Sequence, residues 1–167
     1  MAFSEDGCFL AVAPGQGVQV WDIRMPEPHL LGTYLETFGE TSAVIRYKNN
    51  SFITGHSCGT IQVVTVERSV PRITTHILTG HCPEGVLSLA IKGDHWLAVR
   101  TTSQIRLYEV SLGTASFMGT IPPPSITQII PKAAYWIEND FGAVHLVVCY
   151  AGNIVVQVYE RYCFSNY

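Results

Sequence analysis

The sequence contains few charged residues: Asp, Glu, Lys and Arg make up 14% of its 167 positions, whereas about 25% is usual in soluble domains. Ten basic against thirteen acidic residues give a formal net charge of −3. The chain therefore lacks the basic excess that capture of nucleic acid or of an anionic membrane surface requires. Hydrophobic residues reach 47%, so we expect an extensive buried core and no direct binding to nucleic acid.

Long hydrophobic runs are also missing. The longest, such as residues 143–151, fall well short of the roughly 20 residues that a membrane-spanning helix needs. The first 15 residues carry acidic side chains and no basic residue ahead of their apolar stretch, which is not the pattern of a secretory signal. We expect an intracellular protein, cytoplasmic or nuclear, that does not enter a membrane.

The cysteines exclude two further classes of protein. They are odd in number, irregularly spaced and without a C-x-x-C pair: Cys8, Cys58, Cys82, Cys149 and Cys163. This is not a disulfide framework, and reduced thiols are the simpler account. His56 with Cys58 and His81 with Cys82 offer too few ligands, at poor spacing, for a closed zinc site. We expect no metal and no cofactor.

Signatures of catalysis are absent as well. The sequence has no G-x-S-x-G motif and no pattern that partners a Ser or Cys nucleophile with a His. The glycines at 15 and 17 precede a strand-like segment, whereas a phosphate-binding loop would open a helix. We expect no catalytic residues.

A repeat is what the sequence does contain. Four segments, at 18–22, 61–65, 105–109 and 156–160, share aliphatic first and third positions around a polar second one. Their fourth position falls at residues 21, 64, 108 and 159, a period of roughly 43–44 residues over the first three copies. We expect the aliphatic positions to be buried: Val18, Val20, Ile61, Val63, Ile105, Leu107, Val156 and Val158.

Each copy belongs to a longer unit of strand, turn, strand, turn, strand, loop and strand. The turns "EDG", "KNN" and "KGD" are rich in residues that tolerate tight hairpins. Units of this kind are typical of propeller blades. The sequence thus predicts an all-β fold of about four blades of antiparallel strands, at 2–36, 42–79, 86–121 and 133–167.

The chain resembles a WD-repeat β-propeller. Trp21-Asp22 ends a third strand, and Tyr108-Glu109 and Tyr159-Glu160 are weaker equivalents. Gly80-His81 precedes the third blade, and its distance along the chain from Tyr108 is within the range usual for the family. The family's buried network of His, Ser/Thr, Asp and Trp is eroded here, since His81 is matched with Tyr108 in place of Trp. The resemblance predicts the architecture, with packing rather than that network holding the blades together.

Four blades raise the question of closure, because propellers generally form rings that leave few edges. The chain is part of a longer propeller, or two copies complete a ring, or the protein is an open arc. In the isolated chain the two end blades would expose apolar sheet faces, so we expect self-association unless further blades or a second copy cover them.

The resemblance implies a non-enzymatic scaffold that binds other proteins through rim loops within a larger complex. The family's favoured face maps onto loops 37–41, 80–85 and 122–132, with 14–17, 56–59, 100–104 and 151–153. Candidate binding residues there are Glu40, His56, Pro83 and Arg100. The alternatives are a propeller-based enzyme, of quinone-dependent or glycoside-cleaving type, and a truncated propeller fragment without independent function. The segment 121–125 is either a stiff inter-blade loop or a polyproline ligand.

Overall fold

A computed structural model describes residues 1–35, 39–67, 72–79, 82–111, 113–121, 131–140 and 143–150, with Thr79 and residues 156–160 described by their backbone alone. All secondary structure in this part of the chain is β-strand, and every strand pair is antiparallel. The described residues contain no helix that could cross a membrane. The prediction of an all-β fold is confirmed.

The strands form four sheets, each in sequence order, which we call blades one to four. Blade one holds β1 (Ala2–Phe3), β2 (Phe9–Gly15), β3 (Gly17–Asp22) and β4 (His29–Tyr34). Blade two holds β5 (Thr41–Arg46), β6 (Ser51–His56), β7 (Ile61–Glu67) and β8 (Arg72–Thr79). Blade three holds β9 (Ser88–Lys92), β10 (Trp96–Arg100), β11 (Ile105–Ser111) and β12 (Thr114–Ile121). Blade four holds β13 (Pro131–Glu138), β14 (Val144–Tyr150) and β15 (Val156–Glu160).

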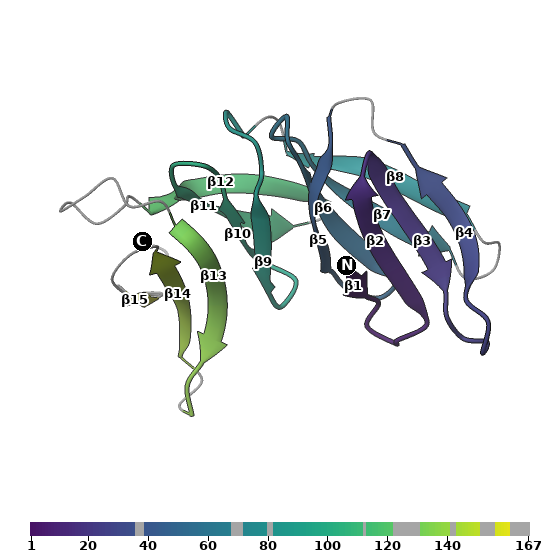
Figure 1. Cartoon of the computed structure of the whole chain (residues 1–167). Helices are drawn as coiled ribbons and strands as arrows, with labels where there is room; N and C mark the ends of the chain where they lie inside the picture. Colours follow the sequence, from purple (N-terminus) through teal and green to yellow (C-terminus); the bar gives the residue numbers. More distant parts are fainter. Residues whose placement is uncertain are drawn as a thin grey trace.

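The blades stand side by side along an open arc, from blade one at the right of Figure 1 to blade four at the left. Among the described residues, no strand of blade one pairs with a strand of blade four. Residues 161–167, the C-terminal part of the predicted fourth blade, lie outside the described residues. The arc is open between its two end blades.

Three hydrophobic cores lie between neighbouring blades. The first joins blades one and two around Phe9 and Phe52, and the second joins blades two and three around Ile53 and Leu97. The third joins blades three and four around Leu146. Because both faces of blade two are covered, all six residues of β6 are buried, as expected for a sheet stacked between two others.

The repeat positions lie in these cores. Val18, Val20, Ile61, Val63 and Ile105 are at most 2% exposed. Leu107 is partly buried against the third core. The side chains of residues 156 and 158 lie outside the described part of the chain. The aliphatic residues of the repeat whose side chains the structure describes therefore pack in the cores between neighbouring blades.

Candidate interaction rim

Four loops come together along one side of the arc, which we call the upper rim: residues 39–40, 57–60, 82–87 and 101–104. They connect β4 to β5, β6 to β7, β8 to β9 and β10 to β11, and they follow the upper edge of the arc in Figure 1. The described parts of the predicted loops 37–41, 56–59, 80–85 and 100–104 contribute to this rim, whereas the predicted loop 14–17 joins β2 to β3 in blade one. Within the predicted loops, residues 37–38, 80–81, 122–130 and 151–153 lie outside the described residues.

Two hydrogen bonds join the first two loops of the upper rim. The Ser57 hydroxyl accepts from the Glu40 N–H at 3.0 Å, and the Ser57 N–H donates to the Glu40 carbonyl at 2.8 Å. Gly39 approaches so closely that a Cβ there would lie 2.7 Å from the Ser57 hydroxyl oxygen. The loop that links blades one and two is thus fixed against the turn of blade two.

The turn of blade two is joined in the same way to the loop that follows. The Cys82 N–H donates to the Gly59 carbonyl at 3.1 Å, and the Val86 N–H donates to the His56 carbonyl at 3.0 Å. Gly59 has a φ of +88°, and a Cβ on it would lie 2.0 Å from the Cys82 carbonyl oxygen. Glycine is required here by both the backbone angle and the close approach.

Glu84 carries the network on to blade three. Its carboxylate accepts from the Thr102 hydroxyl at 2.6 Å and from the Ser103 N–H at 3.0 Å. Hydrogen bonds from the Ser103 hydroxyl, which has the largest effect, and from the Thr102 hydroxyl lower the pKa of Glu84 to about 2, because they stabilise its charged form. The upper rim is therefore one hydrogen-bonded surface that runs over blades two and three and the segments that lead into them.

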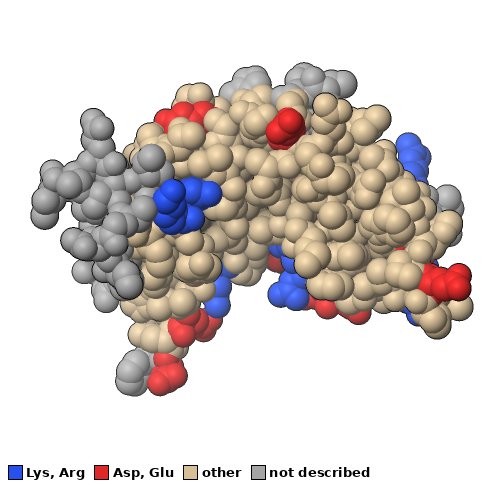
Figure 2. Space-filling model, viewed as in Figure 1, with Lys and Arg blue, Asp and Glu red and all other residues tan. Residues whose placement is uncertain are grey.

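Glu40 and Pro83 lie on the upper rim as predicted, and both are exposed. Other exposed residues of this surface are mostly small or uncharged: Ser57, Cys58, Leu87, Thr102 and Ser103. Figure 2 shows the same character more broadly, with scattered charges separated by wide uncharged areas on the visible face. Among the described rim residues, the acidic side chains of Glu40 and Glu84 are the charged groups.

The prediction that His56 is a rim contact is wrong, because its side chain is 0% exposed. His56 ends β6 and points into the blade, where Nδ1 lies 3.3 Å from the Thr41 hydroxyl and Nε2 lies 3.0 Å from the Thr54 hydroxyl. The sequence placed it in the turn, although the strand continues through it and the turn begins at Ser57. His56 is therefore a buried residue that stabilises the base of the rim turn and does not itself contact a partner.

Arg100 is a half-buried bridge between blades rather than an open loop residue. Its Nε donates to the Ser88 hydroxyl at 3.0 Å within blade three, and its Nη1 donates to the Pro131 carbonyl of blade four at 3.0 Å. Burial lowers the pKa of Arg100. Both bonds are intramolecular, so its side chain stabilises the contact of blades three and four.

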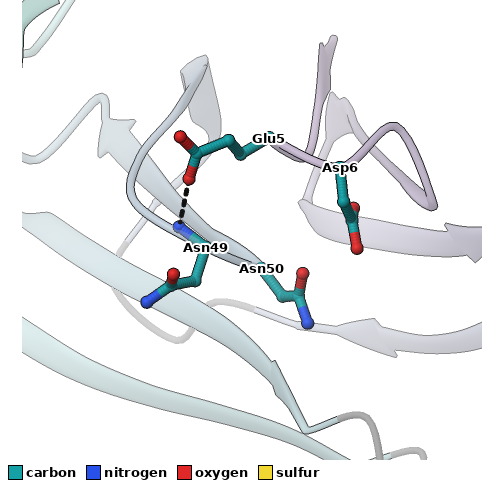
Figure 3. Close-up of a pocket in the computed structure, with 4 residues that line it drawn as sticks. All are labelled: Glu5, Asp6, Asn49 and Asn50. Carbon is teal, nitrogen blue, oxygen red and sulfur yellow. Dashed lines mark hydrogen bonds between the residues drawn. The ribbon is translucent and has the colours of Figure 1, made fainter.

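The opposite side of the arc has a hollow of about 440 Å³, the lower hollow, lined by Glu5, Asp6, Asn49 and Asn50 (Figure 3). The Glu5 carboxylate accepts from the Asn49 N–H at 3.0 Å, as the dashed line in Figure 3 marks. Asp6 accepts from the Cys8 N–H at 2.9 Å. These acids thus hold turns in place, and no cluster of metal-ligating side chains was found among the described residues.

Solved structures match this arrangement. A chain of a crystal structure of a mitotic checkpoint complex aligns with 95% of this chain at 18% identity and a TM-score of 0.64. The fold is an open β-propeller arc. A putative 6-phosphogluconolactonase from Bacteroides fragilis aligns with 95% of this propeller arc at 9% identity and a TM-score of 0.66. The arc spans about half of each matched chain, 46% and 49% respectively.

A scan against protein-family models and a search of curated proteins each found no match. The structural matches, both under 25% identical, show the fold alone. What this propeller arc binds must be argued from its surfaces.

Proposed function

We propose that this chain is a non-enzymatic scaffold of WD-repeat type that binds other proteins through the upper rim. The observation that carries the proposal is the hydrogen-bonded continuity of the rim, from Glu40 through Ser57, Gly59 and Cys82 to Glu84 and Ser103. A surface fixed in this way before binding loses little conformational entropy when a partner docks, which favours affinity.

The chemistry of the rim fits a protein partner. The exposed hydroxyls of Thr102 and Ser103 donate to Glu84 and can still accept hydrogen bonds from a partner. Ser57 adds a third exposed hydroxyl, while Pro83 and Leu87 offer apolar contact. The rim has no described basic side chain of the kind that nucleic-acid backbones attract. The similarity to a chain of a mitotic checkpoint complex is in keeping with a fold used in multiprotein assemblies.

The enzymatic alternative has weaker support. One structural neighbour is a putative lactonase, at 9% identity. The acids of the lower hollow, however, accept hydrogen bonds from turns: Glu5 from Asn49 in the neighbouring turn of blade two, and Asp6 from Ser4 and Cys8 in its own turn. We therefore assign these carboxylates to turn formation. Turnover of a sugar lactone by the purified chain would contradict this assignment.

Site-specific photo-crosslinking in cells tests the proposal. A photoreactive amino acid at Cys58 or Thr102, both exposed on the upper rim, should give crosslinks to one or more discrete proteins. The matched controls are two other exposed residues, Asp94 on the lower side and Glu109 on β11. We expect weak or no crosslinks from the controls. Crosslinks from Asp94 alone would place binding on the lower side and refute the rim proposal.

A further inference from the structure

In all three inter-blade cores, neighbouring blades pack in the same orientation. Each blade has a front face, which carries the aliphatic pair of its third strand, and a back face with the opposite side chains. Every front face packs on the back face of the next blade. The pairs are Val18 and Val20 with Phe52 and Val64, Ile61 and Val63 with Leu97 and Val99, and Ile105 and Leu107 with Leu146 and Val148.

Among the described residues, no core cluster lies on the back face of blade one. Phe3 pairs with Leu10, Leu10 with Trp21 and Trp21 with Leu30, so one apolar row crosses all four strands. Leu10 and Trp21 are cross-strand partners on β2 and β3, as Phe52 and Val64 are on β6 and β7 of blade two. Phe3 is 53% exposed and Leu30 is 37% exposed. This row is as apolar as the buried back faces of blades two and three, but its side chains are partly exposed to solvent.

The part of the chain that the structure describes likewise places no core cluster on the front face of blade four. Tyr135 pairs with Val147 and Ile137 with His145 on the side away from blade three. Tyr135 is 57% exposed and Ile137 is 46% exposed. The alternate residue Trp136 points to blade three, where its Nε1 donates to the Ala90 carbonyl at 3.2 Å. The arc therefore ends in a front face at one side and a back face at the other.

We propose that a second copy of this chain covers both end faces, with the front of blade four in each copy packed on the back of blade one in the other. The two faces differ in kind, as they do inside the arc, and a two-fold rotation makes both contacts at once and closes a ring. The ring would have eight blades, within the usual range of about four to eight.

The lengths of the matched chains support a second copy as the partner that covers the end faces. The arc aligns over 95% of its length with chains of which it covers 46% and 49%. About as many residues again are thus needed to complete those folds, and a second copy supplies that number. The row from Phe3 to Leu30 contains no Asp, Glu, Lys or Arg. On blade four the row of Tyr135 continues through Val147 to Val158, and Glu160, which pairs with His145 in the row of Ile137, is the acidic residue of these rows. The front of one copy therefore meets the back of the other without repulsion between like charges.

Light scattering with size-exclusion chromatography tests the proposal on the 167-residue chain. We expect a species of twice the 18.4 kDa chain mass at micromolar concentration. Phe3→Glu and Tyr135→Glu each place a carboxylate in the proposed contact, and each should weaken the dimer at least about tenfold. Both positions are more than half exposed in the arc, so circular dichroism should show folded variants. Met25→Glu, at a residue 70% exposed on a loop, is the control and should remain dimeric.

Mixing the two variants identifies the geometry. The Phe3→Glu chain keeps an intact front and the Tyr135→Glu chain keeps an intact back, so the mixture should recover a heterodimer through one contact. A wild-type monomer throughout the concentration range would overturn the proposal. So would a dimer that only one of the variants disrupts, since that dimer joins like faces, or open chains that lengthen with concentration.

Discussion

Replacing Gly59 by alanine should separate the turn of blade two from the loop that leads to blade three. The new Cβ would lie 2.0 Å from the Cys82 carbonyl oxygen and 2.9 Å from the Glu84 carbonyl oxygen, both on the backbone. Ordinary contact begins near 3.4 Å, so the two segments must move apart. The Cys82 N–H then loses its 3.1 Å hydrogen bond to the Gly59 carbonyl.

The expected cost has two parts. Alanine at a φ of +88° carries about 1–2 kcal/mol of backbone strain. The broken hydrogen bond and the displaced contact add about 1–2 kcal/mol. We expect Gly59→Ala to lower the free energy of unfolding by about 2–4 kcal/mol, a large part of the stability of a typical domain.

Gly93→Ala is the matched control, because Gly93 has a φ of +55° and a Cβ there would meet nothing within 4 Å. It should cost only the strain, about 1–2 kcal/mol. Urea unfolding followed by tryptophan fluorescence, at one fixed chain concentration, gives both values. Equal losses for the two variants would refute the close approach that we assign to the upper rim.

Two further predictions concern the rim and the arc. Glu84→Gln should lower stability by about 1 kcal/mol near neutral pH, after discounting for solvent exposure. Since the pKa of Glu84 is lowered from 4.5 to about 2, its contribution is complete above pH 4.5 and is lost as the pH falls toward 2. The difference between wild type and variant should therefore vanish over that range in acid-unfolding curves, and a constant difference would contradict the assignment. Arg100→Met should speed amide hydrogen exchange in β13, because the bond to the Pro131 carbonyl is lost, whereas Arg106→Met, which removes a bond within blade three, should leave β13 unchanged.

The strands could be predicted from the sequence because blade packing imposes a pattern on neighbouring residues. A polar residue between two aliphatic ones, as in Val18–Val20, is the local consequence of a sheet with two different faces. The turns at 4–8 and 47–50 were readable for a similar reason, since tight hairpins require Gly, Asn or Asp.

The rim was less predictable, because its contacts join residues that are distant in sequence. Glu84 bonds to Ser103 and Arg100 bonds to Pro131 only when neighbouring blades are in place. The burial of His56 depends on the hydroxyls of Thr41 and Thr54, and no motif marked those threonines. Gly59 was the available signal, since a glycine beside a predicted rim turn indicates a close backbone approach. The intracellular location remains a prediction.

The claim that the upper rim binds a protein partner is tested most directly by hydrogen exchange of the chain, free and in complex with a partner identified by crosslinking. Amides of residues 57–59, 85–87 and 102–104 should exchange more slowly in the complex, while those of residues 5–7 and 93–95 on the lower side should not change. Protection confined to the lower side, with the rim unchanged, would contradict the account.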